Sequence, residues 1–134
     1  MIPEFDNNGY LPIGVHRATL DEVLTRFGHG SEERDAEAQS LAWLVPICRR
    51  ADVARLIVNG SFVTNCIAPN DVDCLLLAGQ SFEADSDAAF ALRAGLPYIS
   101  LQLVETAEEF DYFVRIIFGS DRGAIPKGMV EIIL

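Results

Sequence analysis

Residues 54–78, ARLIVNGSFVTNCIAPNDVDCLLLA, contain two apolar runs that a polar segment separates. The first run, residues 54–60, is rich in β-branched residues and ends at a glycine, which is typical of a buried strand. The second run, residues 72–78, is also apolar and fits a central strand. This stretch therefore predicts two strands of one sheet, with turn and loop chemistry between them.

The residues before these strands predict a leader and two helices. Prolines and glycines punctuate residues 1–17, which we expect to form an ordered, extended leader. A capping box over residues 19–22 begins a short helix, and Gly28 ends it. Residues 31–50 continue as a longer helical pattern that Pro46 is expected to kink or end.

The residues after the strands predict two more helices and two more strands. These elements are a short helix over 86–93, an alternating strand over 97–104, a helix that a capping box at 106–109 begins, and a terminal strand over 129–134. The last helix is expected to place four apolar residues on one face: Phe110, Phe113, Val114 and Ile117. The order of elements predicts an α/β (α+β) fold, a single mixed sheet with helices packed on it, in one domain over residues 1–134.

The net charge of −10 limits the choice of partner. A protein that binds extended nucleic acid usually presents Lys and Arg side chains to the phosphates, and here the ten basic residues are scattered along the chain. A small substrate whose charge a bound cation neutralises is compatible with an acidic surface, and so is a basic protein partner. We therefore expect no extended nucleic acid as a ligand.

Membrane and disulfide features are absent from the sequence. No apolar stretch approaches the ~20 residues that span a bilayer, and the first residues do not match a signal peptide. The three cysteines, Cys48, Cys66 and Cys74, form no CxxC pair and are expected to be free thiols. The sequence therefore predicts a cytoplasmic protein without a membrane segment.

Gly60 and Ser61 end the first strand in a manner that suits a phosphate ligand. Glycine lets a ligand approach the backbone, and serine supplies a hydroxyl group and an amide N–H. If a helical turn follows Ser61, its N-terminus is a further place for an anion. These two residues are therefore candidate nucleotide-binding residues.

Asp71 and Asp73 stand two positions apart where the second strand begins. Side chains at i and i+2 of a strand point to the same face, so we expect both carboxylates to converge on one point. Two close carboxylates repel each other unless a cation lies between them, and Mg²⁺ prefers carboxylate and phosphate oxygens. Asp71 and Asp73 are therefore candidate Mg²⁺ ligands. A purely structural interpretation stays open, because these residue types are also common in turns and solvated loops.

The pattern of strand, Gly-Ser and then Asp-x-Asp at the next strand resembles the DNA polymerase β-like nucleotidyltransferase superfamily, especially its small minimal members. Segments at residues 2–19, 60–64, 69–73 and 127–134 are similar to a family of uncharacterised bacterial and phage proteins with that core. The resemblance implies metal-assisted transfer of a nucleoside monophosphate from a nucleoside triphosphate to a hydroxyl group. It implies that Gly60 and Ser61 would hold the triphosphate, and that Asp71 and Asp73 would bind Mg²⁺.

Active members of that superfamily usually carry a third carboxylate on a later strand. The matching strand here, residues 98–105, presents Ser100 and Gln102 on its polar face. Glu105, at the end of this strand, is the only carboxylate nearby. Glu105 is therefore the candidate third catalytic residue beside the two aspartates.

Two functions from different classes stay open at this point. In the first, the domain binds a nucleoside triphosphate with Mg²⁺ and transfers a nucleoside monophosphate to a protein or small-molecule hydroxyl group. In the second, the domain is catalytically degenerate and serves as a binding or regulatory module, for example an antitoxin-like partner of another protein. An open cleft at Asp71 and Asp73 would favour the first function, and a sealed site would favour the second.

Overall fold

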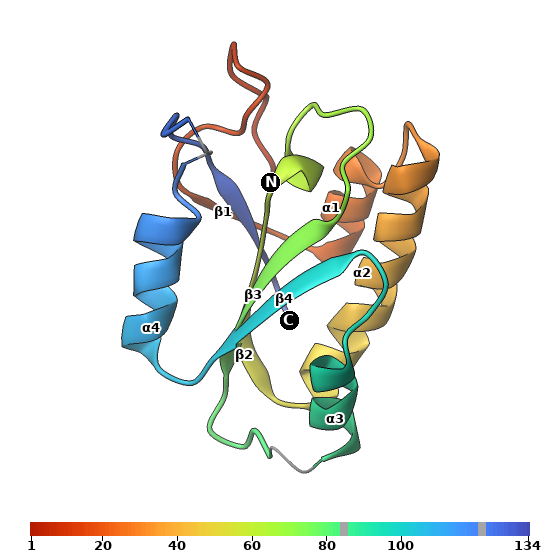
Figure 1. Ribbon diagram of the computed structural model, residues 1–134, viewed down its shortest axis with the longest axis vertical. Coiled ribbons are helices and arrows are strands. Elements are labelled where there is room, and N and C mark those ends of the chain that lie inside the picture. The colour runs from red at the N-terminus through yellow and green to blue at the C-terminus, as the bar shows by residue number, and fades with distance from the viewer. Residues whose placement is uncertain (84–85, 121–122) are drawn as a thin grey trace.

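Five strands form one mixed sheet at the centre of the described part of the chain (Figure 1). The structure is a computed structural model of residues 1–134, and it describes residues 1–83, 86–120 and 123–134. The strands are β1 (Val15–Ala18), β2 (Val53–Asn59), β3 (Val72–Ala78), β4 (Ile99–Val104) and β5 (Met129–Ile132). Their order across the sheet is β1-β5-β2-β3-β4. β1 is parallel to β5 and β3 to β4, whereas β2 is antiparallel to both of its neighbours.

Helices cover both faces of this sheet. Within the described ranges they are α1 (Leu20–Phe27), α2 (Glu32–Arg50), α3 (Asp87–Ala94) and α4 (Ala107–Tyr112), with a 3₁₀ turn η1 (Ser61–Val63) and a π-helical turn η2 (Phe113–Ile117). α1, α2 and α3 lie on one face, and α4 lies on the other (Figure 1). This arrangement confirms the expected mixed α+β fold. None of the described helices is long and apolar enough to cross a bilayer.

Helix α1 begins at the predicted capping box. The Glu22 amide donates to Thr19 Oγ1 at 3.1 Å, and the Thr19 amide donates to Glu22 Oε1 at 3.0 Å. At the other end, the Gly28 amide donates a hydrogen bond of 2.9 Å to the Leu24 carbonyl. The two ends of α1 therefore follow from local sequence chemistry, because each end satisfies backbone groups that have no partner within the helix.

Helix α2 continues past Pro46 to Arg50, so of the two effects expected of Pro46, a kink or an end of the helix, the end is wrong. Proline removes one hydrogen bond from a helix and crowds the carbonyl one turn earlier. Pro46 itself is exposed, but Val45 and Cys48 on either side of it are fully buried. Each buried apolar side chain contributes roughly 1.5–3 kcal/mol, and this packing outweighs the local cost at Pro46.

The predicted leader is ordered, but its last residues form strand β1 rather than an extended connection. Hydrogen bonding to β5 satisfies the backbone of this segment, and Ala18 at its end is fully buried. The turn predicted earlier in the leader is present, because the Asp6 carboxylate accepts hydrogen bonds from two backbone amides. The leader is therefore an integral part of the sheet.

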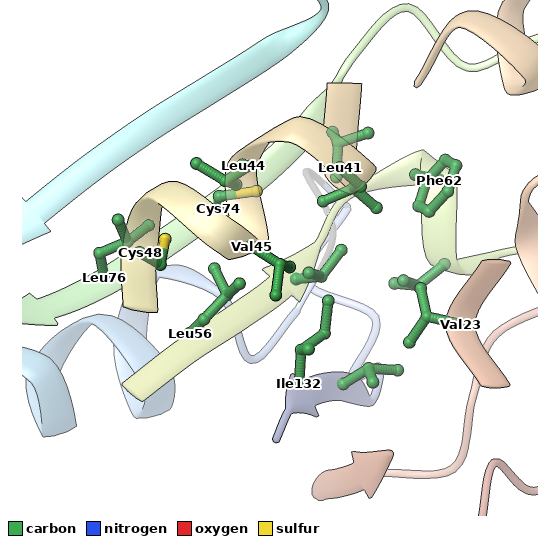
Figure 2. Close-up of a cluster of buried hydrophobic side chains, with 14 of the residues drawn as sticks. Val23, Leu41, Leu44, Val45, Cys48, Leu56, Phe62, Cys74, Leu76 and Ile132 are labelled. Carbon is green, nitrogen blue, oxygen red and sulfur yellow. The ribbon is translucent and has the colours of Figure 1, made fainter. Parts of the chain in front are cut away.

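The larger core lies between α2 and the sheet (Figure 2). Leu41, Leu44 and Val45 of α2 project towards side chains of the strands, including Leu56 and Ile132. Phe62 of η1 belongs to the same core and is fully buried, with its ring centroid 5.9 Å from that of Phe27. The core therefore anchors the loop that follows β2, where the predicted site lies.

A smaller core lies between α4 and the other face of the sheet. Phe110 is buried there, and Phe113 and Val114 are half-buried. Ile117 is 49% exposed, so the expectation that it shares the apolar face is wrong. The reason is the π-helical turn, in which the Phe118 amide bonds to the Phe113 carbonyl at 2.8 Å. A π-turn takes more residues than an α-turn and rotates the following side chains away from the α-helical face.

Candidate functional site

A cleft of about 790 Å³ opens where β2 ends and β3 begins. Its walls come from four separated parts of the chain: the leader, the loop after β2, the start of β3, and the segment between η2 and β5. These parts meet at the upper end of the sheet in Figure 1. Sites for small molecules typically have volumes of about 300–1,000 Å³, so this cleft is large enough for one.

Asp71 and Asp73 are both half-buried and both line this cleft. Asp73 lies in β3, opposite Asn59 of β2 and beside Ser100 of β4. Residues that are directly paired in a sheet share a face, so these three form a polar row across the strands on the α4 side. The structure therefore brings the two aspartates to the same open cleft.

Gly60 brings the backbone against the Asp73 carboxylate. Its φ of +83° and ψ of −168° lie in a region that is essentially restricted to glycine. A Cβ atom at this position would overlap the Asp73 side chain. The glycine is therefore required by its own conformation and also by the closeness of the acid.

Ser61 is exposed at the rim of the cleft and begins η1. A helical turn is present at Ser61, as the phosphate-site interpretation requires. It is a single 3₁₀ turn, in which the Val63 amide donates to the Gly60 carbonyl at 3.2 Å. Such a turn is too short to have an appreciable helix dipole. Ser61 can therefore contribute its own hydroxyl group and amide, and no more.

Arg34 of α2 anchors the loop after Ser61 by hydrogen bonds to its backbone carbonyl groups. It is 6% exposed, and its guanidinium donates hydrogen bonds of 2.6 to 3.1 Å to four backbone carbonyl groups: those of Phe27, Phe62, Thr64 and Cys66. Burial lowers the pKa of Arg34, and the charge of Glu37 opposes this effect. The sequence did not reveal this role, because Arg34 stands in an ordinary polar first turn of a helix.

Glu105 does not join the aspartates. It follows β4 directly after Val104, which pairs with Leu77 at the far end of β3, whereas Ser100 pairs with Asp73. The strand between Ser100 and Glu105 spans about 16 Å at ~3.3 Å per residue. In Figure 1, β4 runs from the cleft end of the sheet towards α4. The register therefore separates the candidate third carboxylate from the cleft.

Lys127 lies in the cleft, a position that the order of elements along the chain does not reveal. Strand β5 enters the sheet between β1 and β2, so the residue just before β5 reaches the end of β2. Lys127 is half-buried, and its amide donates to the Gly119 carbonyl at 3.1 Å. Among the described residues that line the cleft, it is the only Lys or Arg.

Asn59 is a second cleft residue that the pattern analysis did not identify. It is 3% exposed, and its Nδ2 donates to the Phe118 carbonyl at 3.0 Å. Its Oδ1 is buried without a hydrogen-bond partner in the described structure. The available signal was a polar side chain at the end of an otherwise apolar strand.

Glu37 of α2 is fully buried beside the site but does not line the cleft. Neither of its carboxylate oxygens has a hydrogen-bond partner among the described residues. Burial raises the pKa of Glu37 to about 7, Arg34 opposes this effect, and Asp71 and Glu33 add to it. Glu37 is therefore partly protonated at neutral pH.

The cysteines are free thiols, as expected. Burial raises the pKa of Cys48 to about 12 and that of Cys74 well above its ordinary value. Thiols that are buried and protonated are unreactive, so these two are core residues. Cys66 is half-buried and lines the cleft.

The oxygen ligands in the cleft suit a cation that arrives with its substrate. No group of three His, Cys, Asp or Glu side chains in the described ranges could hold a metal ion. Mg²⁺ commonly binds through one or two carboxylates, with substrate phosphates and water completing its shell. Asp71 and Asp73 fit that pattern, and Asn59 Oδ1 is an oxygen without a partner beside them.

Comparison with known proteins places the chain in a family. A family of unknown function (DUF6932) matches residues 3–133. The chain belongs to this family. The DUF6932 match includes the whole cleft from Asn8 to Lys127. No curated protein and no solved structure matches the chain. Because membership of DUF6932 carries no activity with it, the functional argument depends on the site itself.

Proposed function

We propose that the cleft at Gly60, Ser61, Asp71 and Asp73 binds a nucleoside triphosphate together with Mg²⁺. The observation that supports this proposal is the convergence of both aspartates and Gly60 on one open cleft. An open cleft is the arrangement expected of a small-molecule site, and a sealed one would have favoured a degenerate module. The resemblance to minimal nucleotidyltransferases supplies the ligand class.

The charges of the cleft favour a phosphate ligand that a cation accompanies. The charged residues in the described lining of the cleft are Asp71, Asp73 and Lys127, so two negative charges face one positive charge. A triphosphate without a cation would be repelled by the two carboxylates. Mg²⁺ between the carboxylates and the phosphates would remove that repulsion, and Lys127 would pair with a phosphate oxygen.

The reaction that suits this arrangement is transfer of a nucleoside monophosphate to a hydroxyl group of a protein or a small molecule. The hydroxyl oxygen forms a bond to the α-phosphorus, the bond from that phosphorus to the bridging oxygen breaks, and pyrophosphate leaves. Mg²⁺ at the two aspartates would neutralise charge on the phosphates. The hydroxyl proton passes to water, because Ser100 rather than a carboxylate lies beside Asp73. We therefore expect turnover to be slow.

The position of Glu105 favours a second candidate function. Without Glu105, the described lining of the cleft has two carboxylates and lacks a third one. In this alternative the domain has lost catalysis and acts as a binding or regulatory partner of another protein, for example in an antitoxin-like role. Its acidic surface, with a net charge of −10, would then suit a basic partner.

Calorimetric titration of ATP, GTP, CTP and UTP, with and without Mg²⁺, tests the proposal. The wild type is compared with an Asp71→Ala, Asp73→Ala double variant and with Glu105→Gln as a matched acidic control. We expect Mg²⁺-dependent binding to the wild type and to Glu105→Gln, and no detectable binding to the double variant. Absence of binding for every nucleotide would contradict the proposal and favour the regulatory alternative.

Turnover separates the two functions if binding is found. Release of pyrophosphate in the presence of protein or small-molecule hydroxyl acceptors would establish nucleotidyl transfer. In that case Glu105→Gln should retain wild-type activity, because Glu105 lies at the other end of β4. Loss of activity in this variant would show that Glu105 reaches the substrate despite its position.

A further inference from the structure

Asn59 lines the cleft directly opposite Asp73 across the sheet. The two residues are directly paired in the antiparallel register of β2 and β3, so their side chains leave the same face. Directly opposite residues in such a pair have Cβ atoms about 4.5–5.5 Å apart. An oxygen on Asn59 is therefore close enough to share a small cation with the Asp73 carboxylate.

The amide of Asn59 has a defined orientation. Its Nδ2 donates to the Phe118 carbonyl at 3.0 Å, and this hydrogen bond assigns the other atom, Oδ1, as the carbonyl oxygen. Oδ1 exposes less than 1 Å² and has no partner in the described structure. A buried acceptor without a partner is costly, and such groups in folded proteins call for a ligand, an ion or a water molecule.

We propose that Asn59 Oδ1 is the third protein oxygen ligand of the cation held by Asp71 and Asp73, in place of a third carboxylate. This inference rests on the proposed function. Amide carbonyl oxygens are ordinary ligands of Mg²⁺ and Mn²⁺, and they add no negative charge to a site that must also accept a triphosphate. Oδ1 is buried in this structure, so the side chains that cover it move when the cation binds.

A purely structural role for Asn59 makes the opposite prediction for one substitution. In that role, the important atom is Nδ2, which ties Phe118 and the end of η2 to β2. Asn59→Asp keeps the oxygen but removes the donor and adds a buried charge, so a structural role predicts damage that a cation does not relieve. A ligand role predicts that the added carboxylate binds the cation at least as well as the amide does.

The experiment measures Mn²⁺ affinity directly, by the loss of the electron paramagnetic resonance signal of free Mn²⁺ on titration with protein. The variants are Asn59→Leu, which removes both polar atoms, Asn59→Asp, and the Asp71→Ala, Asp73→Ala double variant. Asn7→Asp is the matched control, because Asn7 is exposed in the leader and lies outside the described lining of the cleft. Thermal unfolding of each variant with EDTA or with Mn²⁺ is the second readout.

We expect Asn59→Leu to bind Mn²⁺ about tenfold or more weakly than the wild type, and Asn7→Asp to stay within about threefold of it. Asn59→Asp should have a lower Tm than the wild type in EDTA and a larger rise in Tm on addition of Mn²⁺. If Asn59→Leu does not fold, the Asn59→Asp result decides. Wild-type Mn²⁺ affinity in Asn59→Leu, or a rise in Tm for Asn59→Asp no larger than for Asn7→Asp, would overturn the inference.

The double variant separates the failure of this inference from failure of the proposed function. If the double variant loses Mn²⁺ while Asn59→Leu keeps it, the aspartates bind the cation and Asn59 is structural. If the double variant binds Mn²⁺ as the wild type does, the cation site is not at the aspartates, and both proposals fail.

Discussion

The two ends of β2 carry polar side chains to the same face of the sheet, but they are satisfied in different ways. At one end, Arg55 forms two hydrogen bonds to Glu131 of β5, at 2.7 and 3.0 Å, and its guanidinium lies 4.6 Å from the centre of the Phe110 ring. At the other end, Asn59 keeps an oxygen without a partner, and Asp73 beside it lines an open cleft.

This difference distinguishes a structural polar group from a candidate binding site. The ion pair at Arg55 and Glu131 is completed within the protein, so it contributes to stability. The polar row at Asn59 and Asp73 lines a cleft and includes an atom that the described residues do not satisfy, so a ligand can complete it. Polar composition alone would not separate the two ends, because both have a carboxylate on a strand.

The largest effect is expected at Arg34, which hydrogen-bonds the loop that borders the cleft. Arg34→Met removes the hydrogen bonds from the guanidinium to four backbone carbonyl groups, three of them in buried bonds, and should lower the free energy of unfolding by about 3–5 kcal/mol. Urea denaturation measures this change. Arg26→Met is the control, because Arg26 is half-buried and donates a long hydrogen bond of 3.4 Å to the Ile2 carbonyl. An equal loss of stability in both variants would show that Arg34 has no special role.

The next effect separates backbone strain from contact with the acid. Gly60 and Gly95 have similar dihedral angles, with φ of +83° and +86°, but only at Gly60 would a Cβ atom meet Asp73. Gly95→Ala should cost about 1–2 kcal/mol from strain, and Gly60→Ala should cost about 1–2 kcal/mol more. Gly60→Ala should also weaken nucleotide binding. Equal losses of stability would mean that Asp73 moves aside freely.

Glu37 makes the stability of the protein depend on pH near the cleft end. Its pKa in the folded state, about 7, lies above its ordinary value of 4.5, so between these values the folded protein holds a proton that the unfolded chain has lost. Stability therefore falls as the pH rises through this window. Glu37→Gln cannot ionise and should be more stable than the wild type by roughly 1–2 kcal/mol at pH 8, with little difference at pH 4.

Urea denaturation at the two pH values measures the effect of Glu37→Gln. Glu32→Gln is the control, since Glu32 is exposed on the same helix and is not among the groups that shift the pKa of Glu37. A Glu37→Gln variant whose stability follows the wild type from pH 4 to pH 8 would contradict the account of this buried carboxyl group.

The smallest effect is expected at the ion-pair end. Glu131→Gln leaves the Arg55 guanidinium without its charged partner and should lower the free energy of unfolding by about 1 kcal/mol, because the Arg55 side chain is 40% exposed and solvent screens the pair. Nucleotide binding should not change, since the pair lies outside the cleft lining. Calorimetric titration checks this second point. Weaker nucleotide binding in Glu131→Gln would remove the distinction between the two ends.

The parts of the fold that local chemistry determines could be predicted from the sequence. Thr19 and Glu22 show this for a helix start, and the spacing of Asp71 and Asp73 shows it for the site, because partners two or three residues apart suffice in both cases. For residues whose roles depend on strand order, the sequence does not decide between a site residue and a solvated loop residue. Lys127 reaches the cleft only because β5 inserts between β1 and β2.

Two other errors have the same physical origin. Pro46 does not end α2, because packing of its neighbours against the sheet overrides a local preference. Glu105 was proposed from its closeness in sequence to a polar strand face, but the parallel register of β3 and β4 places it away from the cleft. Distances across a sheet depend on register, which no short motif specifies.

The most direct test of the central claim is thermal unfolding of the wild type and of an Asp71→Asn, Asp73→Asn variant, each with and without Mg²⁺ and ATP. The amides keep the shape of the carboxylates and remove their repulsion. We predict that Mg²⁺ with ATP raises the Tm of the wild type and leaves the Tm of the variant unchanged. An equal rise in Tm for both proteins, or a variant that is less stable while the wild type gains nothing from the ligand, would contradict the claim that this end of the sheet is built to bind a nucleotide.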